Sequence, residues 1–523
     1  MKRIYIIGSY MIMVIIVITM CKTLKLNKNI NIKLNKELGK KIYQVYGVDE
    51  IYSIENSEKI DKAIEGKFSK FNNFKNQLII YNAYGTNKLS LNSYFYTNNE
   101  CKIKYKISVE GVADFERDAY EDKEYLKKHN IQIIGLISGK VNKVTISSED
   151  INGKINNYEF EINVPQFEIP QITKKYQSER ENVSEGLYVL MGGLKNETGM
   201  VDDIFLADDD GNIRGIITTQ KDIDANKNNI IADYVNDFIV YKGNVYYNIS
   251  LNTIAKVNNN GEIDDLFVFE GYTKHHDFKV YDDKIFLLAS ENDANTEEDL
   301  ILIYDINSHE IEKVIDLKEV FPEIYEKCQK ERFAKDWIHI NSIDIRNDKM
   351  LISSRELSSV IELTNFYEEP KIEYIIGPEE IYEDTNLKDK VLNKASNFEI
   401  QLGQHTAFYL DECKIGLYNN AYAYSYVIYW IDWKKYKESD KSFYYEYDIK
   451  KDKNEFELKQ CIEVPYSQYM SGSSKNEKNI IIYSRKSKYF GEFLENGNKV
   501  QEFELNIYCY RIKKYNFKNF WFQ

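Results

Sequence analysis

HINSIDIRNDKMLISSR, residues 339–355, has the pattern on which the fold depends: a histidine, alternating apolar residues, an acidic turn and a second apolar run. The same pattern recurs in HDFKVYDDKIFLLA, residues 276–289, and in HTAFYLDECKIGLY, residues 405–418. The three histidines are nearly evenly spaced along the chain. Repeats of this kind are typical of radial folds, in which equivalent positions converge on one axis. The pattern therefore predicts that His276, His339 and His405 share one pocket.

Further strand-turn-strand units complete the repeat. Two begin near Leu187 and Phe238, before the histidine blocks, and another begins near Asn479, after them. Apolar runs joined by Asp/Asn-Gly turns are what neighbouring antiparallel strands require. We therefore expect an all-β fold with a six-bladed propeller over residues 171–523. Helical insertions are expected at residues 318–336 and 379–397.

The part of the chain before the propeller predicts a separate, smaller domain. Short alternating runs occur between residues 39 and 170, as an Ig-like antiparallel β-sandwich requires. These runs are residues 77–85, 89–97, 102–111, 131–139, 143–148 and 158–164. A helix is expected over residues 56–74, and PQFEIP, residues 165–170, is the predicted linker.

Composition limits the class of protein. A chain of 523 residues exceeds what one core usually supports. The mean hydropathy of −0.52 describes a soluble globular body. The 43 tyrosines and 26 phenylalanines favour strands. A formal charge of −14 argues against nucleic acid as a partner, because no basic surplus can neutralise phosphates.

The N-terminus predicts export. Lys2 and Arg3 precede an apolar run over residues 4–20, so residues 1–21 resemble a signal or a membrane anchor, and residues 22–38 a tether. An uncleaved anchor and a lipid-modified Cys21 are the two leading alternatives, and simple cleavage to a soluble form is a third. All three place the body outside the cytoplasm, and the first two attach it to the membrane. The other five cysteines include no CxxC pair, so they predict neither a zinc site nor a disulfide framework.

The second histidine block carries the richest chemistry. His339 and Asn341 are two apart in a predicted strand, so they would face the same side, and Arg355 follows the next strand. Imidazoles, an amide and a guanidinium donate hydrogen bonds, which suits a sulfuryl or phosphoryl oxyanion. A metal site is the main rival, to which Asp277 and Asp344 would add carboxylates.

The blocks resemble a known family, the bacterial arylsulfate sulfotransferases. The resemblance extends from about residue 40 to residue 510, and the middle histidine block is its most specific part. The residues that carry it are His275-His276-Asp277, Trp337 to Ser342 with Ser353-Ser354-Arg355, Gly403-Gln404-His405 and, in the front domain, residues 81–86, 134–136 and 142–144.

The resemblance implies transfer of a sulfuryl group from an aryl sulfate to a phenol, with no cofactor and no metal. His405 would be the transiently sulfurylated nucleophile, giving a two-step reaction. His339 would be the acid and then the base, and Arg355 and Asn341 would hold the sulfuryl oxygens. His276 would complete the site, although His275 is an alternative for its position. A homodimer is compatible with the sequence, which does not define the oligomeric state.

Two other functions are carried as alternatives. A metal-dependent propeller hydrolase or lactonase would use the same histidines as ligands. A non-catalytic, surface-tethered binding module would use the propeller without chemistry. Activity that survives EDTA would exclude the first, and loss of function in His405→Ala would exclude the second.

Overall fold

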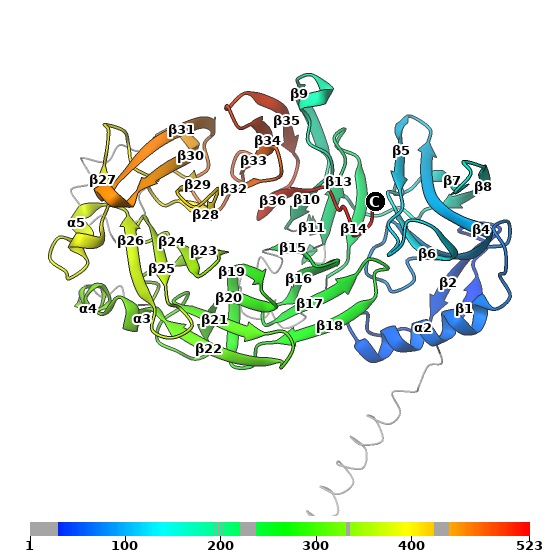
Figure 1. Ribbon diagram of the computed structural model, residues 1–523, viewed down its shortest axis with the longest axis horizontal. Helices are drawn as coiled ribbons and strands as arrows, with labels where there is room; N and C mark the ends of the chain where they lie inside the picture. The colour runs from blue at the N-terminus through cyan, green and yellow to red at the C-terminus, as the bar shows by residue number, and fades with distance from the viewer. Residues whose placement is uncertain are drawn as a thin grey trace, which may run out of the picture.

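The computed structural model describes residues 30–192, 194–196, 199–201, 203–219, 237–330, 335–422 and 439–523. The chain folds into a six-bladed β-propeller with a β-rich front domain at one side (Figure 1). The predicted fold class is therefore confirmed. The exact domain limits predicted above stay a prediction.

Each blade is a sheet of four antiparallel strands, with one more strand on the fifth and the sixth. Blade 2 is β15 (Phe238–Tyr241), β16 (Asn244–Ser250), β17 (Thr253–Asn258) and β18 (Ile263–Val268). Blade 3 is β19 (Tyr272–Tyr281), β20 (Lys284–Glu291), β21 (Leu300–Asp305) and β22 (Glu310–Asp316), and blade 4 is β23 (Ile340–Arg346), β24 (Lys349–Ser354), β25 (Ser359–Thr364) and β26 (Lys371–Ile376). Blade 5 is β28 (His405–Tyr409), β29 (Lys414–Asn419), β30 (Lys441–Lys450), β31 (Glu455–Pro465) and the short β27 (Asn393–Lys394).

The ring closes by exchanging strands between its two ends. The C-terminal strand β36 (Arg511–Tyr515) joins β10 (Leu187–Met191), β13 (Ile204–Ala207) and β14 (Ile213–Ile217) to form blade 1. Blade 6 consists of β32 (Gly472–Lys475), β33 (Asn479–Ser484), β34 (Tyr489–Leu494) and β35 (Lys499–Leu505), with β9 (Ile172–Gln177) on its outside. A small hairpin, β11 (Leu194–Asn196) and β12 (Gly199–Val201), follows β10.

One edge strand of each blade lies at the axis. These inner strands, β36, β15, β19, β23, β28 and β32, contact one another in sequence around the centre, from β15 through β19, β23, β28 and β32 to β36. Polar side chains tie neighbouring inner strands together. Asp277 accepts from the Ile343 amide at 3.2 Å, and Thr406 accepts from the Ser473 amide at 2.8 Å. The inner strands therefore hold a defined position along the axis.

The acidic turns form as the sequence predicts. β19 and β20 pair Tyr281 with Lys284, and Asp282 and Asp283 between them have φ of 48° and 55°. Positive φ at both central residues is the requirement of a tight two-residue hairpin, and Asp adopts it more easily than most residues.

The front domain is built around one long strand. β4 (Ser90–Val109) pairs β3 (Leu78–Tyr81) and β6 (Leu126–Ile134) with its first half, and β5 (Val112–Asp118) and β7 (Val141–Asp150) with its second half. The sequence pattern predicted two separate strands here. The register shift between Tyr96 and Cys101 explains the break in the pattern, since the strand continues across it. The remaining strands are β1 (Asn31–Leu34), β2 (Ile42–Tyr46) and β8 (Ile155–Asn163).

The helices are shorter than predicted. α2 (Ile54–Phe68) begins at Ser53, whose side chain accepts from the Asn56 amide, and it ends before residue 74. The first insertion forms α3 (Leu317–Val320) and α4 (Pro322–Lys330), separated where Pro322 interrupts the hydrogen-bond ladder. The second forms α5 (Glu379–Tyr382) and a single 3-10 turn, Lys388–Lys390. Its later residues instead pair with strands, since Asn393 pairs with Glu455 in β31.

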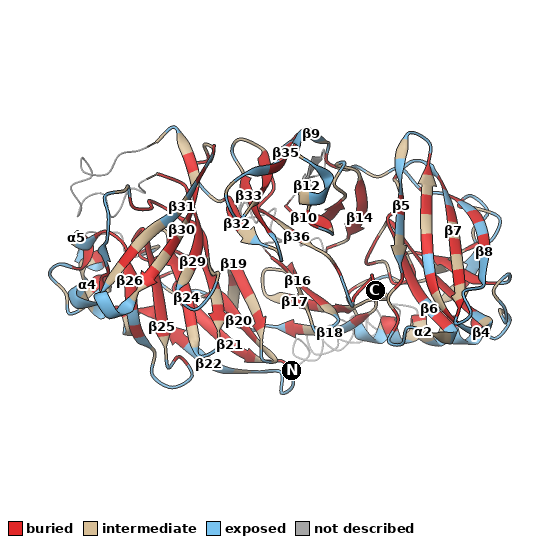
Figure 2. Ribbon diagram, turned by 45° about the horizontal axis from the view of Figure 1, so that its top comes forward, coloured by how far each residue is buried: buried red, intermediate tan, exposed pale blue. Residues whose placement is uncertain are grey.

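The front domain and the propeller share one hydrophobic core. Buried residues of β4 and β6 and of blades 1, 2 and 6 pack into the same cluster. Figure 2 shows in red how far burial extends along these strands. The C-terminal residues reinforce this contact, because the indole nitrogen of Trp521 donates to Gln132 at 2.7 Å and Ala119 bridges to Phe522. The C-terminus therefore lies between the two parts (Figure 1).

The predicted signal or anchor, residues 1–21, lies outside the described residues, as do residues 22–29 of the predicted tether. The rest of the predicted tether is described, and it includes β1 (Asn31–Leu34) of the front domain. Within the part of the chain that the structure describes, no helix has the length and apolar character needed to span a bilayer.

Candidate active site

The three matched histidines come together on three adjacent inner strands: His276 lies within β19, His339 directly precedes β23, and His405 is the first residue of β28. The ring centroids of His276 and His339 are 4.7 Å apart, and those of His276 and His405 are 5.6 Å apart. The Nε2 atoms of His276 and His339 are 2.9 Å apart. The shared pocket predicted from the spacing is therefore present in the structure.

A backbone irregularity aims these histidines at the axis. In blades 3, 4 and 5, the pairing of the inner strand with the next strand of the blade shifts register at the histidine block. His276 and His339 have φ of 47° and 46°, and Thr406, directly after His405, has φ of 51°. Side chains at φ > 0 outside glycine are uncommon and are concentrated at functional sites. The irregularity recurs in three blades, so it belongs to the repeat itself.

This irregularity also changes the position of Asn341. His339 lies before β23, and the bulge between Ile340 and Ser342 breaks the alternation on which the same-face prediction depends. Asn341 is fully buried, and its amide nitrogen donates to the carbonyl of Gln404 at 2.8 Å. Asn341 therefore holds the backbone next to His405.

Carboxylates surround His339. Glu298 lies 2.6 Å and Asp336 2.8 Å from its Nδ1. Burial by itself lowers the pKa of His339, but these two carboxylates outweigh burial and raise that pKa to about 9. Burial also raises the pKa of the Glu298 carboxyl, yet the neighbouring histidines lower it well below its usual value. His339 is therefore cationic at neutral pH.

His405 has the opposite electrostatic environment. It is buried, and neither of its ring nitrogens has a hydrogen-bond partner among the described residues. Burial, followed by the charges of His276 and Arg511, lowers the pKa of His405 well below its ordinary value. A neutral imidazole keeps one unshared ring nitrogen, which is what a nucleophile needs.

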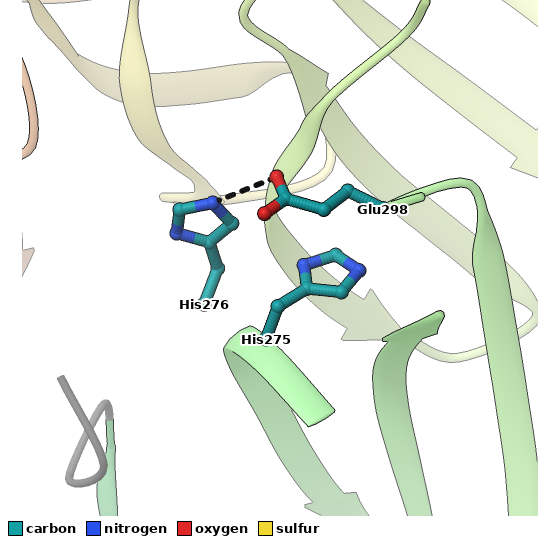
Figure 3. Close-up of side chains that lie close together, drawn as sticks. All are labelled: His275, His276 and Glu298. Atoms are coloured by element: carbon teal, nitrogen blue, oxygen red, sulfur yellow. Dashed lines mark hydrogen bonds and ion pairs between the residues drawn. The ribbon is translucent and has the colours of Figure 1, made fainter. Parts of the chain in front are cut away.

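His276 contacts both His339 and His405, whereas the ring of His275 packs against that of His276, with centroids 5.4 Å apart. Its Nδ1 is 2.6 Å from the Tyr510 hydroxyl, and its Nε2 is 3.1 Å from Glu298 (Figure 3). The ring nitrogens of His275 are buried without partners in the described chain, and burial lowers its pKa to about 3. This geometry agrees with the preference for His276.

Arg355 lies next to His339, as the sequence predicts, but its guanidinium binds carboxylates of the protein itself. Its amide donates to the carbonyl of His339 at 3.0 Å. Its guanidinium donates to Asp336 at 3.0 Å and to Glu356 at 2.5 Å. The side chain is about 20% exposed. Arg355 therefore orients Asp336, which in turn contacts His339.

The sequence analysis missed four residues of this site: Glu298, Asp336, Tyr510 and Arg511. Asp336 is three residues before His339, and this short spacing could have indicated that the two side chains interact. Glu298 lies in an acidic loop between β20 and β21 that resembles a solvated turn. Tyr510 and Arg511 come from the C-terminal strand, which no motif connects to the histidines.

Some of these groups could hold a metal ion. Two sets bring ligand atoms within 4.8 Å of one another. The first is His275, His276 and Glu298 (Figure 3), and the second is Glu298, Asp336 and His339. Asp277 and Asp344, the carboxylates expected for the metal alternative, are used elsewhere. Asp277 accepts from Arg511 and the Ile343 amide, and Asp344 accepts from the Tyr409 amide.

Comparison with protein families gives a consistent result over most of the chain. The family model described as Arylsulfotransferase (ASST) matches residues 173–518, and the model described as Arylsulfotransferase Ig-like domain matches residues 78–165. No protein with a curated function matches the chain.

The solved structures that match are distant. The WD40 domain of Toxoplasma gondii coronin is 7% identical, with a TM-score of 0.34, over 66% of this chain and 78% of that one. BamB from Moraxella catarrhalis is 9% identical, with a TM-score of 0.30, over 76% and 96%. A streptogramin B lyase is 11% identical, with a TM-score of 0.29, over 77% and 98%. Similarity at this level carries no argument about function.

Proposed function

This chain belongs to the arylsulfotransferase family and is a sulfotransferase enzyme, and we propose that it works in two steps through a sulfurylated His405. The donor in this proposal is a phenolic sulfate ester, and the acceptor is a second phenol. Both substrate classes fit the family.

One observation carries the proposal: the two histidines with the leading roles have opposite surroundings, since two carboxylates contact His339 and neither ring nitrogen of His405 has a partner among the described residues. The pKa of His339 is raised to about 9, whereas that of His405 is lowered well below its ordinary value. Environments that separate the pKa values of neighbouring groups assign the acid and the base. His339 is thus suited to give a proton at neutral pH, and His405 is suited to attack.

In the first step, a ring nitrogen of His405 attacks the sulfur of the donor. The N–S bond forms while the bond between sulfur and the aryl oxygen breaks, and the bonding electrons leave with that oxygen. A phenol has a pKa of about 10, by analogy with tyrosine, so its oxygen leaves more easily when His339 supplies a proton.

In the second step, the acceptor phenol enters the vacated position. His339, now neutral, takes the proton of the acceptor hydroxyl while the acceptor oxygen attacks sulfur. The N–S bond breaks, and His405 returns to its neutral form. The two steps balance without an added base, because His339 loses one proton and regains one.

The other candidate residues support these two. His276 lies between His339 and Tyr510 and fixes the orientation of the His339 ring. Asn341 holds the Gln404 carbonyl next to His405, and Arg355 orients Asp336. The prediction that Arg355 and Asn341 also bind sulfuryl oxygens stays part of this proposal.

The test is release of nitrophenol from 4-nitrophenyl sulfate by the full-length protein, with and without added phenol. We expect release that requires phenol, formation of phenyl sulfate, and loss of both in His405→Ala. Mass analysis after donor alone should find one added sulfuryl group on the peptide that contains His405. Release without phenol would indicate a sulfatase, and a modified peptide elsewhere would contradict the role of His405.

A second candidate, a metal-dependent hydrolase, has one observation in its favour. Glu298, Asp336 and His339 offer ligand atoms close enough to hold an ion. Such an enzyme would lose activity in EDTA and regain it with a divalent cation. We expect the sulfotransferase activity to survive EDTA, because a cationic His339 does not ligate a metal.

We also propose that the protein is exported and stays attached to the membrane through residues 1–21, as an uncleaved anchor or through lipid on Cys21. The apolar run after Lys2 and Arg3 supports this proposal. Fractionation of cells that express wild-type protein and Cys21→Ser tests it. Release of the Cys21→Ser protein would favour lipid, and retention would favour the anchor.

A further inference from the structure

Arg511 is a buried arginine whose charge is only partly used. It is the first residue of β36, the inner strand of blade 1, and it is 3% exposed. Its Nη1 donates to Asp237 at 2.9 Å and to Asp277 at 2.8 Å. Its Nε and Nη2 atoms are buried and have no partner in the part of the chain that the structure describes. One edge of the guanidinium is therefore unsatisfied.

A second buried arginine shows that this is unusual within the same molecule. Arg214 is 1% exposed, and each of its three nitrogens has an acceptor: Asp208 at 2.7 Å, the Gly135 carbonyl at 3.2 Å and the Ala113 carbonyl at 2.9 Å. Buried polar groups of native proteins are nearly always hydrogen-bonded, and exceptions call for an explanation. The free edge of Arg511 indicates a group that arrives from outside the chain.

The surroundings of Arg511 locate that group next to His405. Tyr510, its neighbour in the chain, has its ring centroid 6.0 Å from that of His405, and the Arg511 guanidinium carbon is 5.6 Å from the Tyr510 ring. Asp277, which binds Arg511, directly follows His276. Arg511 also lines a cavity of about 270 Å³ together with Thr406 and Ala407, which follow His405.

The partners of Arg511 hold it firmly in this place. Burial by itself lowers the pKa of Arg511, but Asp277 and Asp237 raise it above its ordinary value, so the guanidinium is always charged. Its contacts come from blades 2 and 3, since Asp237 precedes β15 and Asp277 lies in β19. A charged group fixed from two blades does not need to reorganise during a reaction, which is the condition for strong transition-state stabilisation.

The unsatisfied edge has the geometry for an oxyanion. Nε and Nη2 of one guanidinium present parallel N–H groups, which match two oxygens of a carboxylate, phosphate or sulfuryl group. The ring nitrogens of His405 are likewise buried without a partner among the described residues, and both the His405 ring and the Arg511 guanidinium carbon lie within 6.0 Å of the centre of the Tyr510 ring. A sulfuryl group bonded to His405 would bring three oxygens there.

We propose that Arg511 binds two sulfuryl oxygens through Nε and Nη2, both in the donor and in the sulfurylated form of His405. This inference rests on the proposed function and adds a residue to its site. The N–S bond forms and the S–O bond breaks as described above. Arg511 gives up no proton and stabilises the charge that develops on the sulfuryl oxygens.

The first test compares conservative variants of the two buried arginines. Arg511→Lys keeps a positive charge near Asp237 and Asp277 but loses the paired N–H groups. We expect its kcat for phenol-dependent transfer to fall about a hundredfold, the typical effect of one lost donor at such a site. Arg214→Lys, the matched control, should keep the wild-type kcat while losing thermal stability. Equal kcat for Arg511→Lys and wild type would overturn the inference.

The second test uses the wild-type protein, so it does not depend on folding of a variant. A crystal structure with inorganic sulfate at saturating concentration should place two sulfate oxygens within hydrogen-bond distance of Nε and Nη2 of Arg511. Sulfate bound only at Arg355, or absent from Arg511, would overturn the inference. If wild type itself transfers no sulfuryl group, the proposed function fails. If wild type is active and Arg511→Lys has the same kcat, only this inference fails.

Discussion

Two buried histidines, one in the front domain and one at the propeller axis, have opposite surroundings. His129 is fully buried, with its Nδ1 2.9 Å from Glu121, its Nε2 3.0 Å from Thr97 and its ring stacked on Phe95. His405 is buried to nearly the same degree, and neither ring nitrogen has a partner among the described residues. The same side chain is thus satisfied in one region and unsatisfied in the other.

The difference teaches how to separate structural from chemical roles in this molecule. A satisfied buried group stabilises the fold, because its removal leaves its partners without hydrogen bonds. An unsatisfied buried group costs stability, and it persists where a substrate or intermediate completes it. The two arginines, Arg214 and Arg511, divide in the same way.

The largest expected effect is on activity at the unsatisfied histidine. His405→Ala should lower phenol-dependent transfer by about a thousandfold or more, because removal of a nucleophile leaves only binding and electrostatic stabilisation. Its thermal midpoint should be no lower than that of wild type, since no hydrogen bond is lost and an unsatisfied buried group is removed. A large loss of stability with activity retained would break the comparison.

A buried charge in the propeller that has its ion-pair partner should contribute to stability, as the hydrogen-bonded His129 does in the front domain. The ammonium of Lys514 in β36 binds Glu492 of β34 at 3.0 Å, and both side chains are fully buried. Lys514→Ala should lower the free energy of unfolding by about 3–5 kcal/mol, because it leaves a buried carboxylate without its cation. The measurement is a denaturant titration.

The control for Lys514 is Lys459→Ala, which removes an exposed partner of Glu457 and Asp448 and should cost less than about 1 kcal/mol. Equal effects of the two substitutions would show that burial does not decide the value of these ion pairs.

A smaller loss of stability is expected at the satisfied histidine. His129→Ala should destabilise the protein by about 1–3 kcal/mol, because Glu121 and Thr97 lose a buried partner. Its kcat should not change in the folded protein, which thermal melting and transfer assays will show together. A loss of kcat without a loss of stability would mean that the front domain takes part in catalysis, and it would contradict the purely structural role of His129.

The smallest effect is a shift of the pH profile. Below a pH of about 9 His339 keeps its proton, so the rate should fall as pH rises through that value. Glu298→Gln removes the carboxylate that contributes most to raising the pKa of His339, and should move this alkaline limb to lower pH. Glu297→Gln, at a partly exposed site paired with Lys335, is the matched control and should leave the profile unchanged. An unshifted limb in Glu298→Gln would assign the titration to another group.

Much of the fold could be predicted from the chain because blades repeat. Asp282 and Asp283 indicated a tight turn, and the pattern around it recurs in other blades. The exceptions arise where tertiary pairing overrides the local signal. β4 continues through a polar stretch because β6 and β7 pair with it on both sides of Cys101, and residues after α5 pair with β31 instead of extending the helix.

The sequence by itself determined that His276, His339 and His405 occupy equivalent positions in a radial repeat, because equal spacing in the chain becomes convergence on one axis. Only the tertiary structure decided their chemical difference. Glu298 and Asp336 reach His339 from loops, and Arg511 reaches the axis from the last strand after the ring has closed. Burial strengthens each of these interactions, so the protonation states depend on neighbours that no local pattern specifies.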